Sequence, residues 1–284
     1  MRIFVAGATG VIGRRLVPLL VQRGHSVTGL VRRPADAGWL RGLGAEAVTG
    51  DAFDRDGVLR ALRQVTPDVV IDQLTDLKSR NFQANSTIRK TGTRHMVDAA
   101  LAAGVRRMVV QSIAWMYEAG GVPAVESVPL DLGASGSRRQ TAQGVTALES
   151  AVRDLPEWVV LRYGLLYGPG TWYARDGLMA EQAARGELAA DGDMSSFVHV
   201  DDAAGAAVDA LEWPTGAVNV CDDVPAAGHD WVPVFCRAVG ASDPAVITPA
   251  ERHGWARGAS NEHARKKLNW TPAYPSWREG FAHL

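Results

Sequence analysis

Residues 2–13 read Arg-Ile-Phe-Val-Ala-Gly-Ala-Thr-Gly-Val-Ile-Gly, and this stretch decides the fold. Its first five residues form a short apolar run that ends at Gly7. From Val11 to Gln22 the apolar side chains recur at helical spacing. The stretch therefore predicts a strand, a tight turn and a helix.

The turn between this strand and this helix predicts a phosphate-binding site. Backbone N–H groups and the positive end of a helix dipole meet there, and both attract a pyrophosphate. Glycines let the backbone approach the phosphates closely. A glycine pattern alone also fits an ordinary tight turn, but its place between a strand and a helix favours dinucleotide binding. The predicted contacts are Gly7, Thr9, Gly10, Val11, Ile12 and Gly13.

Strands and helices alternate along the first part of the chain. Further strands are predicted at 26–31, 46–49, 68–73, 107–111 and 158–163, and helices at 55–64, 84–103 and 139–153. This alternation predicts an α/β fold with a doubly wound parallel sheet. After Gly168-Pro169-Gly170 the pattern becomes less regular, with strand-like pieces at 217–221 and 246–248. We expect a dinucleotide-binding domain over 1–165 and a mainly substrate-binding region over 166–284, with segments that return to the first domain.

Composition narrows the range of partners. The 284 residues include 30 Lys and Arg against 31 Asp and Glu, a formal net charge of -1, so no basic excess points to nucleic acid. The two cysteines show no metal-ligand spacing, and we expect no metal. No early apolar run approaches the length of a membrane helix, and no signal peptide is evident. We expect a cytoplasmic protein that acts on a small molecule, and a homodimer stays open.

Two positions bear on the choice of cofactor. Arg32 and Arg33 follow the second predicted strand, where an acidic residue would bind the ribose hydroxyls of NAD(H). Arginine suits a 2′-phosphate, so NADP(H) is expected rather than NAD(H), unless both arginines are merely solvated. Asp51 follows the third strand and is placed to accept a hydrogen bond from the adenine amino group, or to cap the next helix.

A larger set of motifs extends over nearly the whole chain. It consists of the glycine turn, Gly50-Asp51, Gly92-Thr93, Ser112 with Tyr117 beyond it, the segment from Leu161 to Gly170, Phe197-Val-His-Val-Asp-Asp202, Asn219-Val220 and Leu268-Asn-Trp-Thr-Pro272. In this order the set resembles the extended or atypical short-chain dehydrogenase/reductase family, also called the NAD-dependent epimerase/dehydratase family. The resemblance implies a Rossmann fold, a small carboxy-terminal substrate domain and a cleft between them. It also implies cofactor contacts at Leu74, Thr75, Ser112, Tyr163, Gly164 and Leu165.

The resemblance implies a catalytic tyrosine four residues before a lysine, whose ammonium lowers the pKa of the phenol. No Tyr-x-x-x-Lys occurs in this chain, and Thr141 and Val145 occupy the corresponding positions. Three substitutes are predicted, one of them the pair Arg138-Arg139, which could bind an acidic substrate group or simply be solvated. Ser112 could polarise a carbonyl group, or be a strand-end hydroxyl satisfied by the backbone. Tyr117 could donate a proton, or simply pack in the core.

The resemblance also places aromatic side chains, among them Trp115, Trp172 and Tyr173, around the substrate. The predicted function is that of an NADP(H)-dependent oxidoreductase acting on a carbonyl or alcohol of a small molecule. One alternative is a non-redox epimerase, lyase or cyclase that retains the dinucleotide, which the missing pair favours. Another is a dinucleotide-sensing binding protein, which needs no catalytic pair. The sequence leaves the substrate open.

Overall fold

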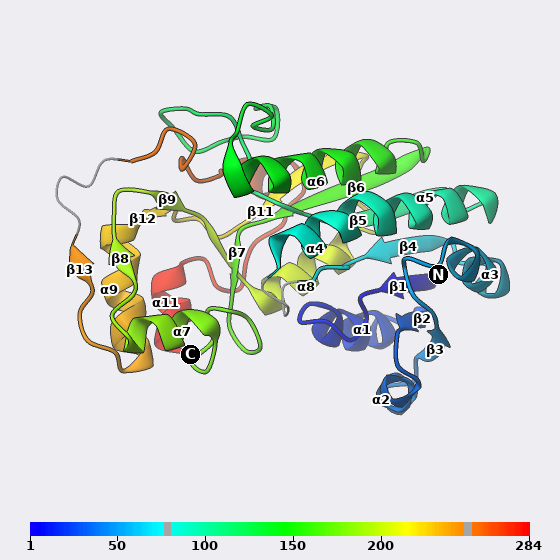
Figure 1. Ribbon diagram of the computed structural model, residues 1–284. Helices are drawn as coiled ribbons and strands as arrows, with labels where there is room; N and C mark the ends of the chain where they lie inside the picture. Colours follow the sequence, from blue (N-terminus) through cyan, green and yellow to red (C-terminus); the bar gives the residue numbers. More distant parts are fainter. Residues whose placement is uncertain (77–80, 247–251) are drawn as a thin grey trace. The chain divides into compact units, whose positions relative to one another are not determined.

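The structure, a computed structural model, describes residues 1–76, 81–246 and 252–284 (Figure 1). It divides into two compact units. Unit 1 comprises residues 1–112, 132–161 and 204–217, and unit 2 comprises residues 113–131, 162–203 and 218–284. Of the strand predicted at 246–248, residues 247 and 248 lie outside the described residues.

The central sheet decides the fold class. Within the described chain it has seven strands in the order β11-β6-β5-β4-β1-β2-β3. Their bounds are β1 Arg2–Ala6, β2 Ser26–Val31, β3 Glu46–Thr49, β4 Val69–Asp72, β5 Arg107–Ile113, β6 Glu157–Tyr163 and β11 Gly216–Val220. Ile3 of β1 lies opposite Val27 of β2 on one side and Val69 of β4 on the other, in parallel register. The predicted doubly wound α/β class is confirmed.

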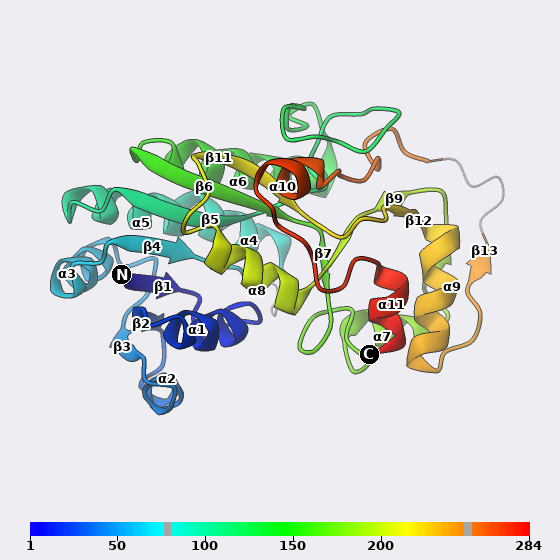
Figure 2. The same ribbon diagram turned by 180° about the vertical axis from the view of Figure 1, so that it is seen from behind.

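Helices cover both faces of the sheet in unit 1 (Figure 1). On one face lie α3 (Arg55–Val65), α5 (Thr93–Ala102) and α6 (Gly136–Val152), and α5 packs against both of the others. On the other face lie α1 (Gly13–Gln22) and the part of α8 (Val200–Asp209) that belongs to unit 1, as Figure 2 also shows. Arg23 and Asp209 join the ends of these two helices by an ion pair of 2.9 Å.

The core of unit 1 explains why its strands are almost continuously apolar. Phe4, Val70, Met108 and Val110 from the strands and Val58, Leu62, Met96 and Val97 from the helices are fully buried. A parallel sheet covered on both faces buries the side chains of successive residues, so strict alternation of polar and apolar residues disappears.

The predicted helix at 84–103 is divided into three parts. It begins earlier than expected, as α4 (Phe82–Thr87), because the Asn81 side chain accepts a hydrogen bond of 3.0 Å from the Ala84 N–H. A π-helical turn over Ile88–Gly92 follows, and α5 then continues to Ala102. Such turns are frequent at functional sites. Sequence patterns also missed the short helix α2 (Ala37–Gly42).

Unit 2 is built around an aromatic core. Tyr173 meets Phe197, Trp231 and Phe235 edge to face, with ring centroids 5.4–5.7 Å apart. The core is enclosed by α7 (Leu178–Ala184), α9 (Gly228–Val239) and α11 (Trp277–Ala282), together with the parallel pair β7 (Leu165–Tyr167) and β10 (Phe197–His199). The remaining elements are β8 (Ala189–Ala190), β9 (Met194–Ser195), β12 (Ala226–Ala227), β13 (Ala245–Val246) and α10 (Glu262–Lys267).

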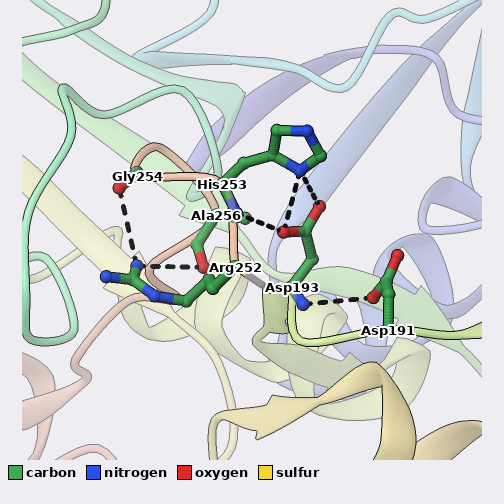
Figure 3. A network of polar contacts seen from close by, with 6 residues as sticks. All are labelled: Asp191, Asp193, Arg252, His253, Gly254 and Ala256. Atoms are coloured by element: carbon green, nitrogen blue, oxygen red, sulfur yellow. Dashed lines mark hydrogen bonds and ion pairs between the residues drawn. The ribbon is translucent and has the colours of Figure 1, made fainter. Parts of the chain in front are cut away.

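A polar network fixes the segment that begins at Arg252 within unit 2 (Figure 3). The backbone N–H of His253 donates to Asp193 over 2.8 Å, and its ring Nδ1 lies 2.9 Å from the other carboxylate oxygen. Arg252 donates to the carbonyl oxygens of Ala256 and Gly120, over 3.2 and 2.7 Å. This chain segment is therefore held by polar contacts rather than by a strand or helix.

A buried carboxyl group stands at the end of β4. Asp72 accepts hydrogen bonds from the Leu74 N–H over 3.0 Å and from the Thr93 hydroxyl over 3.2 Å. Burial nevertheless raises the pKa of Asp72 from 3.8 to about 6, because it disfavours the charged form. The folded protein therefore binds a proton here that the unfolded chain releases at a lower pH.

We predict that replacing Asp72 with asparagine removes a destabilisation that grows as the pH rises from about 4 to about 6. A raised carboxyl pKa lowers the free energy of unfolding across that interval and not above it, by about 3 kcal/mol here. Asp72→Asn should therefore unfold at a higher denaturant concentration than the parent at pH 8, and the gain should vanish near pH 4.

The control is Asp68→Asn, at an exposed carboxyl group that binds Arg2 and has a lowered pKa. This variant should have a lower free energy of unfolding than the parent near neutral pH, whereas Asp72→Asn should have a higher one. A gain for Asp72→Asn that is equal at both pH values would contradict the prediction.

Candidate active site

Two of the three glycines in the first turn are required by the packing of unit 1. Gly7 has φ +82°, and a Cβ there would lie 2.6 Å from the Gln73 carbonyl oxygen at the end of β4. A Cβ on Gly13 would lie 2.2 Å from the Gly7 carbonyl oxygen. Real Cβ atoms do not come so close, so these glycines let β1, β4 and α1 meet.

Gly10 has a different environment. Its N–H donates to the Gly7 carbonyl oxygen over 2.9 Å. A Cβ on Gly10 would lie 3.2 Å from that same oxygen and would meet no other described atom within 4 Å outside its chain neighbours. Next to it, no described residue accepts a hydrogen bond from the N–H groups of Val11 and Ile12. The first turn of α1 also carries no acidic residue. Open space, N–H groups without acceptors and a helix N-terminus together fit a pyrophosphate.

The two arginines after β2 differ. Both side chains are exposed, but Arg33 donates two hydrogen bonds of 3.0 Å to Asp36. Among the described residues Arg32 has no such partner, so its guanidinium is available to a ligand. Asp51 accepts from the Phe53 N–H over 2.9 Å, and the N-cap of α3 is Asp54. The helix-capping alternative for Asp51 is therefore wrong, and the adenine contact stays a prediction.

The remaining predicted cofactor residues lie at strand ends. In unit 1, Leu74 and Thr75 are half-buried after β4. In unit 2, the N–H groups of Gly164 and Leu165 donate to the carbonyl oxygens of Val220 and Ser196, over 3.0 and 2.7 Å. The Tyr163 hydroxyl donates to the Ala203 carbonyl oxygen over 3.1 Å. The Leu74 N–H donates to the Asp72 carboxyl group over 3.0 Å, whereas the residues of unit 2 are held by backbone carbonyl oxygens.

Ser112 stands at the carboxyl end of β5 and is fully buried. Its hydroxyl donates to Oε1 of Glu149 on α6 over 2.7 Å. Thr141 and Val145 lie two turns and one turn before Glu149 on the same buried face of α6. The Thr141 hydroxyl donates to the Ser137 carbonyl oxygen over 3.2 Å. The face of α6 that the family resemblance assigns to a catalytic tyrosine and lysine therefore carries Thr141, Val145 and, one turn further on, Glu149, whose carboxylate binds Ser112.

Sequence reasoning missed one charged residue of this region. Arg89 lies in the π-helical turn and is only 4% exposed. Burial lowers the pKa of its guanidinium to about 10, although the negative charge of Glu149 acts in the other direction. A signal was present, because Asn85, Arg89 and Thr93 recur every four residues on the buried face of a predicted helix.

In unit 2, Tyr117 lies in a buried network. Its hydroxyl donates to Oδ1 of Asn219 and accepts a hydrogen bond of 3.0 Å from Arg162, whose guanidinium also stacks on the ring. One donor and one acceptor bond occupy most of the hydrogen-bonding capacity of a phenol. Donation of its proton to a substrate would require the bond to Asn219 to open. The catalytic roles of Ser112 and Tyr117 stay predictions.

The three aromatic residues predicted to contact substrate have different surroundings in unit 2. Trp115 is half-buried, and Trp172 is half-buried against the aromatic core. Tyr173 is inside that core, where burial raises the pKa of its hydroxyl. Their contact with substrate stays a prediction.

Comparison with known proteins agrees with this architecture. The model of the NAD dependent epimerase/dehydratase family matches residues 3–221. The 3-diazoavenalumate denitrifying reductase of Streptomyces sp is 43% identical over 305 aligned positions, which cover 99% of both chains. The ceramide reductase of Caulobacter vibrioides is 27% identical over 97% of this chain and 87% of its own. The solved structure of Thermus thermophilus UDP-glucose 4-epimerase with NAD has a TM-score of 0.78 at 24% identity, covering 99% and 97% of the two chains.

The sheet order and the glycine turn define a Rossmann-type protein that binds a nicotinamide dinucleotide. The family match extends over most of the chain, and the chain belongs to the NAD dependent epimerase/dehydratase family. With two reductases among its relatives, it is an NAD(P)-dependent enzyme of the oxidoreductase type. The resemblance drawn from the motifs is confirmed. Among the described helices, none is long and apolar enough to cross a membrane.

We predict that Gly10→Val weakens NADPH binding roughly tenfold or more while the protein stays folded. The valine side chain would occupy the open space at the helix N-terminus, where the backbone must approach the pyrophosphate. Titration calorimetry measures the affinity, and thermal unfolding monitors the fold.

The comparison variant is Gly13→Val, whose side chain would collide with backbone and should lower the unfolding temperature strongly. If folded Gly10→Val binds NADPH as tightly as the parent, the turn is not the phosphate site.

Proposed function

We propose that this chain is an NADP(H)-dependent reductase of a small aromatic molecule whose hydride acceptor is a diazo group rather than a carbonyl group. The observation that carries the proposal is the buried face of α6, where Thr141 and Val145 stand in place of a phenol and an ammonium group. In this proposal residues 1–165 bind the dinucleotide and residues 166–284 mainly bind the substrate.

The two acceptors differ in their demand for a proton. Addition of hydride to a carbonyl carbon leaves an alkoxide, so the complete reaction consumes one proton and benefits from a general acid. Hydride added to the terminal nitrogen of an arenediazonium ion gives a neutral aryldiazene, Ar–N=NH. The carbon–nitrogen bond then breaks, N2 leaves, and the N–H hydrogen ends on the ring carbon. This sequence consumes no external proton, which suits a site without a Tyr-Lys pair.

The relatives support this choice of acceptor. The 43% identical protein from Streptomyces is named as a denitrifying reductase of 3-diazoavenalumate, which is a diazo compound. The alignment covers 99% of both chains, so it extends over both units. The ceramide reductase supports reduction in general, at lower identity. Reduction of a carbonyl group is the competing hypothesis.

The cofactor residues suit NADP(H). NADPH supplies the hydride when it is bound. The glycine turn and the N-terminus of α1 would hold its pyrophosphate. The guanidinium of Arg32, which has no partner among the described residues, would hold its 2′-phosphate. Arg33 is already engaged by Asp36, so Arg32 carries the preference in this proposal.

We predict that the parent binds NADPH roughly ten- to hundredfold more tightly than NADH, because a charge-assisted hydrogen bond to the 2′-phosphate is worth about 1.5–3 kcal/mol. Arg32→Ala should remove most of that preference by weakening NADPH binding alone. Calorimetry with both cofactors measures it.

Arg33→Ala is the matched control, since it removes a neighbouring exposed arginine whose charge is paired with Asp36. It should change the preference only slightly. Equal affinity of the parent for both cofactors, or an effect of Arg33→Ala as large as that of Arg32→Ala, would refute the role of Arg32.

The acceptor is tested with two compounds that share a carboxylate. With NADPH, 3-carboxybenzenediazonium should be converted to benzoate and N2 at a kcat/KM at least about tenfold above that for reduction of 3-formylbenzoate. General acid catalysis typically contributes about 10²–10⁴-fold, and only the aldehyde needs it. NADPH absorbance, corrected for the reaction without protein, gives the rates, and chromatography identifies benzoate.

Thr141→Ala should leave the diazonium rate within about threefold, because no proton passes through this hydroxyl. An aldehyde reduced as efficiently as the diazonium ion would establish carbonyl chemistry instead. Bound NADPH without turnover of either compound would refute the reductase proposal as stated.

A further inference from the structure

One buried arginine of unit 1 has no hydrogen-bond partner among the described residues. Arg89 is 4% exposed, yet among the described residues no group forms a hydrogen bond, an ion pair or a ring contact with its guanidinium. A buried guanidinium normally has carboxylate or carbonyl partners, because taking a charge out of water is energetically unfavourable. Arg162, also buried, follows that rule: it binds Tyr117 and the Glu126 carbonyl oxygen.

The position of Arg89 follows from the contacts of the helix before it. Ser86, three residues earlier, donates to the Gln140 carbonyl oxygen over 3.0 Å, and its hydroxyl lies 2.7 Å from where a Cβ on Gly144 would be. The charge of Arg89 interacts with Glu149. Arg89 therefore lies beside the turn of α6 that runs from Gly144 to Glu149 and contains Val145. A cation is present beside α6, but it comes from another helix.

Of Arg89, Ser112 and Glu149, only Arg89 can donate a hydrogen bond to a ligand. Ser112 has a single hydroxyl proton, which it donates to Glu149. Glu149, as a carboxylate, can only accept. Arg89 has five N–H groups in a planar arrangement that matches a carboxylate. An anionic oxygen brought to this region would therefore bind Arg89 rather than Ser112.

The guanidinium of Arg89 is not completely enclosed. None of its nitrogens is among the fully enclosed side-chain atoms without partners in the described chain, although the residue as a whole is buried. A guanidinium that binds an anionic ligand should be slightly exposed and should lack hydrogen-bond partners within the protein. The widened π-helical turn that carries Arg89 is itself a departure from regular helix at this point.

We propose that Arg89 binds the carboxylate of the substrate, so that the substrates of this enzyme are small aromatic acids. The proposal rests on the proposed reductase function and specifies its substrate class. A carboxylate held by a bidentate arginine fixes both the position and the orientation of an aromatic acid. Glu149 favours the charged form of this guanidinium, and it accepts the hydroxyl proton of Ser112.

The experiment compares two probes of similar shape that differ in charge, cinnamate and cinnamamide. Their binding is measured by titration calorimetry with NADP⁺ present, so that no hydride transfer occurs. The parent should bind cinnamate roughly tenfold or more tightly than cinnamamide. Arg89→Met, which keeps most of the length of the side chain without its charge, should bind the two equally, and Arg89→Lys should retain part of the preference.

Two controls distinguish carboxylate binding by Arg89 from a general effect of positive charge and from cofactor binding. Arg139→Met removes an exposed arginine at the start of α6 and should leave the preference for cinnamate unchanged. Affinity for NADP⁺ should stay within about threefold in every variant, because Arg89 does not bind the cofactor phosphates in this proposal. If Arg89→Met does not fold, as shown by circular dichroism, Arg89→Gln takes its place.

Three results would overturn the proposal: no preference for cinnamate in the parent, a preference that survives loss of the charge at Arg89, or a large loss of NADP⁺ affinity in the variants. The last result would assign Arg89 to the cofactor instead. The diazonium assay remains independent, because turnover of a diazonium ion without any preference for a carboxylate would leave the reductase function standing and remove only Arg89 from it.

Discussion

The parallel pairing of β1 with both β2 and β4 is the constraint on which unit 1 depends. It brings the carboxyl ends of these strands to one edge of the sheet, where the chain order reverses and a ligand can bind. The close approach there leaves no room for a side chain at Gly7 or Gly13, and of the three glycines in the turn it leaves open space only at Gly10. The same glycines that allow the sheet to close therefore also prepare the phosphate site.

Three buried charged residues of unit 1 lie on neighbouring elements: Asp72 at the end of β4, Arg89 in the π-helical turn and Glu149 on α6. Asp72 is paired with hydroxyl and N–H donors, and Glu149 accepts from Ser112. Of these buried charged groups in the described chain, Arg89 alone lacks a hydrogen-bonding partner. An unpaired buried guanidinium contributes nothing to core packing, because its desolvation is unfavourable. It can, however, bind an anion. A valine at the lysine position of α6 and an arginine beside it fit an enzyme that must hold a charged substrate but need not supply a proton.

Much of unit 1 could be predicted because its elements are local. Strands β1, β2 and β3 have the predicted bounds, and β4, β5 and β6 differ by at most two residues at either end. Apolar runs, periodic helices and glycine turns are visible within a few residues. The π-helical turn was not predictable in this way, because one extra residue in a helical turn leaves no local sequence pattern; the turn contacts α6, which is distant in the chain.

The sequence by itself determined the fold class, the glycine turn, the family and the absence of a Tyr-Lys pair, because each depends on residue types at fixed spacing. Only the tertiary structure decided which polar groups are already engaged. Arg32 and Arg33 are equivalent in the sequence, yet Asp36 pairs with one of them. Arg89 is one basic residue among 30, yet folding buries it without a hydrogen-bond partner in the described chain. Hydrogen-bond partners and burial arise from segments far apart in the chain, so no local pattern encodes them.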